Sequence, residues 1–424
     1  MSRYLPRLID KLIEEDLRLY GAVSIEGCKW CGKSTTAARF ARSKLELQNP
    51  NTRQSNLSLA ANKPSLLLEG EKPRMIDEWQ DAPELWDAVR YDVDQTGLVG
   101  QYILTGSSVP RKKQPKHSGA GRIARITMRP MSLFESGDSN GKVSLEDLFS
   151  EEADVEGISE LTLEDVAYLA ARGGWPENVL RKPEKANKLA KDYLNTILGN
   201  DVNSEDVVAH NPSKMRVLLR SLARNIASPA SINTILEDTK DDRESTISDV
   251  TISTYLATLE RIHIIDDVEA WCPDLRSKTQ IRTSKKRNFV DPSLAVAALR
   301  ASEKDLLNDF NTFGLVFESL ALRDLQIYAQ SLDGDLFYYR DKNGLECDAV
   351  VHLPDGKWGA IEIKLGADEE TLDKAASNLI KFKEAVDTSS MKEPSFLMIL
   401  SGISTYAYRR RDGVFVIPIG CLKN

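Results

Sequence analysis

Near the N-terminus, apolar and polar positions change from a helical to a strand-like pattern. Between residues 4 and 20 the apolar positions recur mostly at i, i+3 and i+4, which predicts a helix. The short apolar run Ala22–Ile25 then predicts a strand, and Thr35–Arg42, rich in Ala and Arg, predicts a second helix. A glycine-containing segment separates these two elements. Strand, glycine loop and helix in this order fit an α/β domain.

Two further apolar runs end in polar side chains. Arg74–Ile76 is followed by Asp77 and Glu78, and Gly100–Leu104 is followed by the hydroxyl and glycine residues Thr105–Ser108. In a parallel sheet, ligands bind at the carboxyl ends of the strands. We therefore expect these polar residues to lie beside the glycine loop.

The middle third has the pattern of amphipathic helices. Apolar positions fall on one helical stripe in 182–198 and on another in 217–226. A short helix, a break at 238–245, a helix at 248–260 and a β-prone run at 262–265 then follow. This order of elements is typical of a winged helix.

The charges of this segment favour protein packing over DNA binding. The loop 238–244 is net acidic, and the helix after it has no Arg or Lys before Arg261, so phosphate contacts would be poor. The one local basic patch comes later, at Arg276, Lys278, Arg282, Lys285, Lys286 and Arg287. Nucleic-acid binding stays open at this point.

The last third predicts a small α/β domain. The pattern indicates a helix at 314–328 and strands at 335–340, 346–352 and 358–365. Because side chains alternate along a strand, Glu362 and Lys364 share one face of the last strand.

Composition is that of a soluble globular protein with several domains. The chain has 424 residues, 41% hydrophobic and 28% charged, and a net charge of −8, so no global basic field attracts nucleic acid. No apolar run approaches the roughly 18 residues that span a bilayer, and the N-terminus lacks an apolar signal core. We expect a cytoplasmic protein without membrane contact.

The glycine loop itself matches G-x-x-x-x-G-K-[ST], the P-loop pattern. Glycines at both ends allow backbone N–H groups to surround phosphate oxygens, and the next helix points its positive end at the same charge. Lys33 would reach the β and γ phosphates, and Ser34 would offer a hydroxyl to Mg²⁺. ATP and Mg²⁺ are the predicted cofactors. The expected nucleotide contacts are Gly27, Cys28, Lys29, Trp30, Cys31, Gly32, Lys33, Ser34 and Thr35.

The polar strand ends supply the remaining chemistry. Asp77 would hold Mg²⁺ through water, and Glu78 would orient the attacking water. Thr105 and Ser107 would contact the γ-phosphate or that water. Cys28 and Cys31 also form C-x-x-C, but no second pair of metal-ligating residues follows, so we interpret them as loop fillers.

Several motifs together resemble the prokaryotic AAA-type ATPases that carry a C-terminal DUF4143 domain. They are the P-loop, Asp77–Leu85, Leu104–Ser108, Gly121–Ile123, Arg129–Glu135, Arg172–Glu177, Asp192–Leu194 and Asn200–Val202. The resemblance implies a sensor-like position at 105–108 and makes Arg122 an arginine finger or phosphate-sensing arginine. This chain departs from the family inside the loop, where relatives have basic or polar residues with Gln or Gly.

The tail has a second constellation of charged residues. Asp348 precedes Glu362 by 14 positions, and the spacing Asp-x13-Glu-x-Lys with Lys364 resembles the PD-(D/E)xK nucleases. Glu318 occupies the position of that fold's helical carboxylate. Two acids would hold Mg²⁺ while the lysine activates water or steadies the charged phosphorane. The alternative is a Glu–Lys pair on a solvated strand face.

These observations predict an α/β fold with a P-loop ATPase parallel sheet, a helical and winged-helix-like middle, and a small α/β restriction-endonuclease-like domain. The predicted boundaries are 1–136 for the ATPase domain, 137–160 for a linker or exposed insertion, 161–227 for a helical domain, 228–300 for a winged-helix-like domain and 301–424 for a nuclease-like domain, with the DUF4143 region at about 190–365.

Three functions remain open on the sequence. The first is an ATPase whose nucleotide state controls its C-terminal domains. The second is an ATP-dependent metal nuclease acting on DNA or RNA. The third is a nucleotide-gated interaction module with an inactive tail. A homo-oligomer and a protein partner are compatible with all three.

Overall fold

The described residues of the computed structural model form two compact units. The model describes residues 4–107, 117–150, 153, 155–198, 211–240, 247–273, 284–386 and 391–424. The first unit comprises the described residues up to Pro130 together with 257–264, and the second comprises the rest. Some residues singled out in the sequence lie outside the described residues: Ser108, Asn200–Val202, most of the break at 238–245, and Arg276, Lys278 and Arg282.

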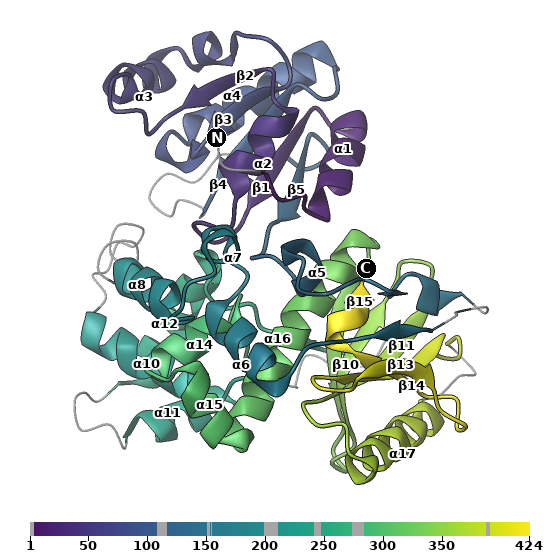
Figure 1. Cartoon of the computed structure of the whole chain (residues 1–424). Coiled ribbons are helices and arrows are strands. Elements are labelled where there is room, and N and C mark those ends of the chain that lie inside the picture. Colours follow the sequence, from purple (N-terminus) through teal and green to yellow (C-terminus); the bar gives the residue numbers. More distant parts are fainter. Residues whose placement is uncertain are drawn as a thin grey trace. The chain divides into compact units, whose positions relative to one another are not determined.

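The first unit is built on a five-stranded parallel sheet with strand order β2-β3-β4-β1-β5 (Figure 1). Its strands are β1 (Ala22–Glu26), β2 (Ser43–Glu46), β3 (Arg74–Asp77), β4 (Tyr102–Gly106) and β5 (Ile123–Thr127). Its helices are α1 (Ile9–Leu19), α2 (Lys33–Phe40), α3 (Arg53–Asn62) and α4 (Glu84–Thr96), with 3₁₀ turns at Pro64–Leu68 and Trp79–Asp81. Because β4 lies between β1 and β3, their carboxyl ends meet at one edge.

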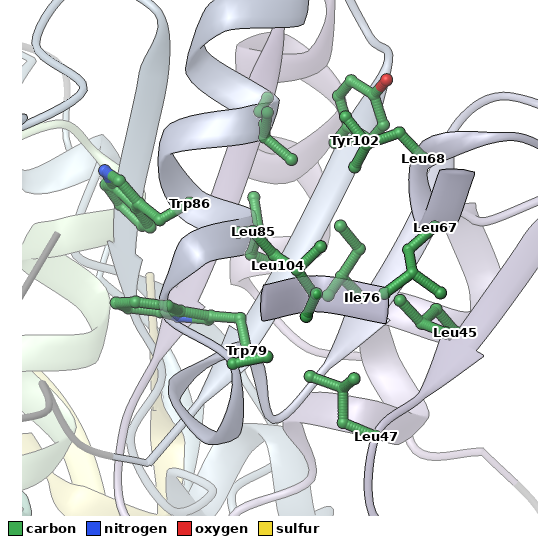
Figure 2. Packing of buried hydrophobic residues seen from close by; sticks show 14 of the residues in the cluster. Leu45, Leu47, Leu67, Leu68, Ile76, Trp79, Leu85, Trp86, Tyr102 and Leu104 are labelled. Carbon is green, nitrogen blue, oxygen red and sulfur yellow. The ribbon is translucent and has the colours of Figure 1, made fainter. Parts of the chain in front are cut away.

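The core of this unit fixes the segment that follows β3 (Figure 2). Leu45, Ile76 and Leu104 are paired across β2, β3 and β4, so their side chains share one face of the sheet. Trp86 of α4 packs on Trp79 with ring centroids 4.7 Å apart, and both rings are fully buried. Truncating a buried Trp costs roughly 3–5 kcal/mol. Trp79 therefore anchors the turn that begins just after Asp77.

The second unit has a helical part and a mixed sheet (Figure 1). Its helices are α5 (Leu133–Ser136), α6 (Leu163–Arg172), α7 (Pro176–Arg181), α8 (Lys188–Thr196), α10 (Pro212–Arg224), α11 (Ile232–Lys240), α12 (Asp249–Arg261), α14 (Pro292–Ala298), α15 (Glu303–Asn308), α16 (Phe310–Ser331) and α17 (Glu369–Ala385), and the end of α12 falls in the first unit. Its strands are β6 (Val143–Ser144), β7 (Gly157–Ile158), β8 (Glu269–Ala270), β9 (Asp335–Arg340), β10 (Glu346–His352), β11 (Trp358–Lys364), β12 (Phe396–Ser401), β13 (Tyr406–Arg409), β14 (Phe415–Pro418) and β15 (Leu422–Lys423). Short 3₁₀ turns lie at Asp147–Phe149 and Ile419–Cys421.

The larger sheet of this unit has strand order β7-β13-β14-β12-β11-β10-β9-β8. Its central strands β11, β12 and β14 run parallel, whereas β9, β10 and β11 are antiparallel neighbours. Trp271, Trp358 and Phe382 of α17 form an aromatic cluster with centroid separations of 4.7–6.0 Å. The small two-stranded sheet pairs β6 with β15. The tail thus has the mixed α/β character that the sequence predicted. The nuclease-like fold of the tail stays a prediction.

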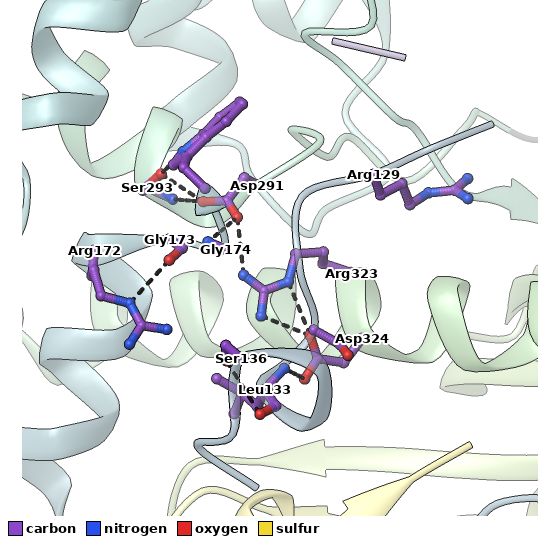
Figure 3. Close-up of polar contacts among 12 residues, drawn as sticks. Arg129, Leu133, Ser136, Arg172, Gly173, Gly174, Asp291, Ser293, Arg323 and Asp324 are labelled. Carbon is purple, nitrogen blue, oxygen red and sulfur yellow. Dashed lines mark hydrogen bonds and ion pairs between the residues drawn. The ribbon is translucent and has the colours of Figure 1, made fainter. Parts of the chain in front are cut away.

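A buried ion network joins the helices of the second unit (Figure 3). Arg323 of α16 donates to Asp291 at 2.9 Å and to Asp324 at 2.7 and 2.9 Å, and all three side chains are at most 1% exposed. Asp291 also accepts from the N–H of Gly174, and Asp324 accepts from the N–H of Leu133. The network thereby ties α16 to the first residue of α5 and to the segment before α7.

Two segments differ from what their sequence suggested. Residues 137–160, expected to be a linker or an exposed insertion, are partly buried, because β6 pairs with β15, β7 pairs with β13, and Leu145 and Leu148 are buried. The acidic composition suggested that the whole segment is exposed, whereas the acidic side chains occupy exposed positions between these buried leucines. The β-prone run 262–265 forms only an isolated bridge at Ile265, since His263 adopts a left-handed φ of 55° and turns the chain.

No helix among the described residues is both long and apolar enough to cross a bilayer.

Candidate functional site: the carboxyl edge of the parallel sheet

The P-loop connects β1 to α2 through an unusual backbone path. Gly27 has φ 155° and Gly32 has φ 107°, both in the region that favours glycine, and Trp30 has φ 66°. A Cβ on Gly27 would lie 2.2 Å from the carbonyl oxygen of Met128, so no other residue fits without displacing the chain. The loop begins on β1 and ends at the N-terminus of α2, where backbone N–H groups bind anions.

Lys33 is the first residue of α2 and is 5% exposed. Its Nζ donates to the carbonyl oxygens of Gly27 at 2.9 Å and Cys28 at 2.7 Å. The ammonium group therefore lies inside the curve of the loop. Phosphate oxygens would offer it stronger, charge-assisted partners than these neutral carbonyls.

Three oxygen-bearing side chains from three segments meet beside the loop. Ser34 Oγ donates to Asp77 Oδ1 at 2.7 Å, and Thr105 Oγ1 donates to the same oxygen at 2.5 Å. Asp77 ends β3 and is paired with Thr105 of β4. Hydroxyl and carboxylate oxygens are the donors that Mg²⁺ accepts, together with waters and phosphate oxygens. The residues present therefore fit this ion.

Glu78 follows Asp77 and is held in a left-handed conformation with φ 57°. Its carboxylate accepts a short hydrogen bond from Gln80 Nε2, which also lies 3.5 Å from Ser107 Oγ. Burial raises the pKa of Glu78, although the positive charge of Lys33 opposes this. A raised pKa suits a group that accepts a proton. Thus Glu78, Thr105 and Ser107 come together at this edge.

The expected nucleotide contacts differ in exposure along the loop. Trp30 is 61% exposed, Thr35 is exposed and Lys29 is partly buried. Cys28 and Cys31 are instead fully buried free thiols.

Arg122 does not join these residues. It precedes β5, and its carbonyl accepts from the N–H of Ala22 at the start of β1, whereas the P-loop follows the other end of that strand. Its guanidinium, half-exposed, pairs with Asp94 of α4 at 2.6 Å. Within one chain, Arg122 thus lies at the opposite edge of the sheet from the P-loop.

Arg7 lies in no recognisable motif, yet it holds the end of the P-loop. Arg7 is 6% exposed and donates to the carbonyl of Cys31 at 2.9 Å and to that of Arg129 at 2.7 Å. Arg129 follows the carboxyl end of β5, on the same edge as the P-loop. The only sequence signal for Arg7 was a charged residue at the start of an otherwise apolar helical pattern.

The charged residues predicted in the tail also come together, and an additional lysine joins them. Lys364 Nζ lies 2.9 Å from Asp348 and 2.7 Å from Glu362. Lys286 Nζ lies 2.5 Å from Glu318 and 4.0 Å from Asp348. Among the described residues, no group of three or more His, Cys, Asp or Glu side chains is arranged to hold a metal ion.

The pKa shifts reflect this pairing. Burial and the neighbouring Asp348 raise the pKa of Glu362 to about 7, against the effect of Lys364. Burial acts the same way on Asp348, but Lys364 and Lys286 outweigh it and hold its pKa below the usual value. The two carboxyl groups therefore differ in proton affinity although one lysine contacts both.

Three family models match successive parts of the chain. An AAA domain matches residues 20–136, and a domain of unknown function (DUF8612) matches residues 163–305. A second domain of unknown function (DUF4143) matches residues 313–422. The range of about 190–365 predicted above for DUF4143 therefore began and ended too early. No curated protein sequence matches the chain.

The solved structures that match the chain are distant from it. The Walker-type ATPase of Pyrococcus abyssi is 15% identical with a TM-score of 0.40, and the alignment covers 68% of this chain and 94% of that one. AMPPCP-bound DnaA from Aquifex aeolicus is 15% identical, with a TM-score of 0.28 and coverage of 60% and 86%. The Aeropyrum pernix Orc1 protein in complex with DNA is 12% identical, with a TM-score of 0.27 and coverage of 70% and 94%.

The P-loop, the polar strand ends beside it and the three matched models lead to one conclusion: the chain contains a P-loop ATPase domain of the AAA class, followed by DUF8612 and a C-terminal DUF4143 domain.

Proposed function

We propose that the first unit binds and hydrolyses ATP with Mg²⁺ at the carboxyl edge of its sheet. The observation that carries this proposal is the meeting of Ser34 and Thr105 at one oxygen of Asp77, next to the loop that holds Lys33. A strand end with no binding role does not require three polar side chains to meet in this way. Mg²⁺, when bound, supplies a Lewis acid that offsets the charge of the phosphates.

The residues divide the work between binding and proton transfer. Lys33 exchanges the carbonyls of the loop for phosphate oxygens and stabilises the charge of the transferred group. Glu78 orients the attacking water and accepts its proton. Gln80 acts as a positioning residue, because its amide holds the Glu78 carboxylate and reaches toward Ser107.

ATP binding and turnover measured on three variants test this assignment. Lys33→Ala should abolish ATP binding or weaken it severely, and unchanged binding by calorimetry would remove the P-loop assignment. Glu78→Gln should bind Mg-ATP but lose at least about 100-fold in turnover, since its amide cannot accept the proton. The exposed Glu71→Gln is the matched control and should turn over normally. Wild-type turnover in Glu78→Gln would exclude Glu78 as the proton acceptor.

We further propose that the nucleotide state controls the C-terminal domains through Arg7. This residue holds the P-loop at Cys31 and the chain at Arg129. Four residues after Arg129, the N–H of Leu133 donates to the buried Asp324 of α16 at 3.0 Å. A displacement of the loop by phosphate would therefore pull, through Arg7 and a short peptide, on an anchor point of the second unit.

Hydrogen exchange of the backbone amides of α16, with and without ATP, tests this coupling. We expect ATP to change protection of α16 in the wild type and in the exposed control Arg18→Ala, but not in Arg7→Ala. If Arg7→Ala still binds ATP and α16 responds as in the wild type, coupling through Arg7 is refuted.

Metal-dependent phosphodiester cleavage by the tail is a second candidate function. The gathering of Asp348, Glu362 and Lys364, with Glu318 and Lys286 nearby, supports it. Burying these carboxylates unpaired would cost on the order of several kcal/mol, and Lys286 and Lys364 offset part of that cost. For a divalent metal to bind at Asp348 and Glu362, Lys364 must move away from one of the two carboxylates.

Cleavage of single- and double-stranded DNA and RNA should be assayed with Mg²⁺ or Mn²⁺, with ATP and at low salt. Glu362→Ala and Lys364→Ala should abolish nicking without changing ATP turnover, whereas the exposed Glu370→Ala should cut normally. Metal binding without cleavage would favour the third function, an interaction module with an inactive tail. Absence of metal binding at Asp348 and Glu362 would refute the site.

A further inference from the structure

The P-loop contains two thiols that touch each other. Cys28 and Cys31 are both free and 0% exposed, and the Cys28 thiol hydrogen-bonds to the sulfur of Cys31. An atom at the Cβ position of Gly27 would lie 3.4 Å from Cys31 Sγ. The sulfur is therefore packed against the backbone of the loop itself. Contact between the two sulfurs is the first geometric requirement for a disulfide within the loop.

The surroundings of this pair favour a reactive thiolate. Burial alone raises the pKa of Cys31, but the hydrogen bond from Cys28 and the positive charges of Lys33 and Arg7 outweigh it and lower the pKa to about 6. Burial instead raises the pKa of Cys347 and Cys421. Because the thiolate is the nucleophilic form, we expect Cys31 to react with oxidants faster than Cys347 and Cys421.

The pair lies just beneath the surface of a loop. Trp30, between the two cysteines, is 61% exposed, and Lys29 and Gly32 are partly exposed. A small oxidant therefore needs only a local displacement of the loop to reach the sulfur, not an opening of the sheet.

We propose that Cys28 and Cys31 are a thiol modification site that hydrogen peroxide converts into a disulfide, with loss of ATP binding. The Cys31 thiolate attacks one peroxide oxygen, which breaks the O–O bond, releases hydroxide and leaves a sulfenic acid. The Cys28 thiol then attacks the Cys31 sulfur, forms the S–S bond and releases water. The hydroxide takes up the proton that the Cys31 thiol gave off, so in total two thiols lose two protons and two electrons and one peroxide becomes two waters.

The disulfide acts on the phosphate site because both cysteines belong to it. A bond between residues 28 and 31 fixes the loop around the carbonyl of Cys28 that Lys33 contacts. The loop then cannot adjust its backbone N–H groups and release Lys33 to phosphate oxygens. Conversely, bound triphosphate places negative charge near Cys31, which disfavours the thiolate, so ATP should slow the oxidation. This inference rests on the proposed binding of ATP by the P-loop.

The test treats the full chain with hydrogen peroxide, blocks remaining thiols with N-ethylmaleimide and maps disulfides by peptide mass spectrometry. ATP affinity is measured by calorimetry before oxidation, after it and after dithiothreitol. We expect a disulfide between Cys28 and Cys31, an affinity lower by on the order of tenfold or more, recovery with dithiothreitol, and slower oxidation with Mg-ATP present.

Two variant types separate the site from other thiols. Cys28→Ser and Cys31→Ser cannot form the disulfide, so the affinity of each, relative to its own reduced form, should show no dithiothreitol-reversible loss. Cys272→Ser, which removes a partly exposed cysteine outside the loop, should respond like the wild type. Absence of the disulfide while Cys272 is modified overturns the proposal, and so does a disulfide that leaves affinity unchanged. Failure of the reduced protein to bind ATP would instead refute the proposed function, whereas the mapping would still decide whether the disulfide forms.

Discussion

Replacing Arg323 by Met should destabilise the second unit strongly. Arg323 makes three hydrogen bonds of 2.7–2.9 Å to Asp291 and Asp324, and all three side chains are at most 1% exposed. Methionine fills much of the same volume but leaves two carboxylates buried without their cation. Removing one partner of a buried ion pair costs about 3–5 kcal/mol, so we expect a loss of that size.

A unit-specific assay is required because the chain has two compact units and need not unfold in one step. Hydrogen exchange of the amides in α16 reports the opening free energy of the helix that carries Arg323. The control is Arg181→Met, which removes an exposed i,i+4 pair with Glu177 and should cost less than about 0.5 kcal/mol. A loss within about 1 kcal/mol of this control would refute the reasoning.

A second substitution tests whether the unpaired charge or the lost packing causes the destabilisation in Arg323→Met. The double variant Arg323→Met with Asp324→Asn removes one of the two stranded charges, yet it keeps an oxygen for the N–H of Leu133. We expect it to recover part of the stability lost in Arg323→Met. No recovery would mean that the lost contacts, and not the unpaired charge, cause the destabilisation.

Three further predictions concern the first unit. Gly27→Ala should prevent ATP binding because its Cβ would collide with a carbonyl oxygen 2.2 Å away, whereas Gly314→Ala, with open space around it, should bind ATP normally by calorimetry. Thr105→Val should lower ATP turnover by about 10-fold or more in a steady-state assay, because Asp77 loses the donor that orients it; unchanged turnover would exclude this role. If Arg122 acts across a subunit boundary, mixing Arg122→Ala with Lys33→Ala protein should restore some hydrolysis, and a demonstrated mixed oligomer without recovery would exclude that role.

The sequence predicted the parts of the site that depend on local spacing. The P-loop and the carboxylates after β3 could be found because each lies within a few residues of an apolar run that forms a strand. Parallel pairing then brings strand ends together, so the proximity of Asp77 and Thr105 followed from the fold class. The α/β character, the AAA class and the DUF4143 domain are confirmed on this basis.

Contacts that depend on long-range packing could not be predicted in the same way. Lys286 belongs to the local basic patch that left nucleic-acid binding open, yet it is buried between Glu318 and Asp348, residues distant from it in sequence. Likewise, the acidic residues of 137–160 concealed the apolar side chains that pack in the second unit. The amino-acid composition of a segment does not distinguish its exposed positions from its buried ones, whereas the packed structure does.

The two arginines of the first unit show what a motif leaves undecided. Arg122 belongs to a recognisable motif, but the motif does not say on which edge of the sheet the residue lies, and in this chain that edge is opposite the P-loop. Arg7 belongs to no motif, yet it is buried and donates to both the P-loop and the segment after β5. Burying a guanidinium is costly unless its donors are satisfied, and here the acceptors are backbone carbonyls on two different segments. A residue held in this way resists a shift of the P-loop relative to the segment after β5.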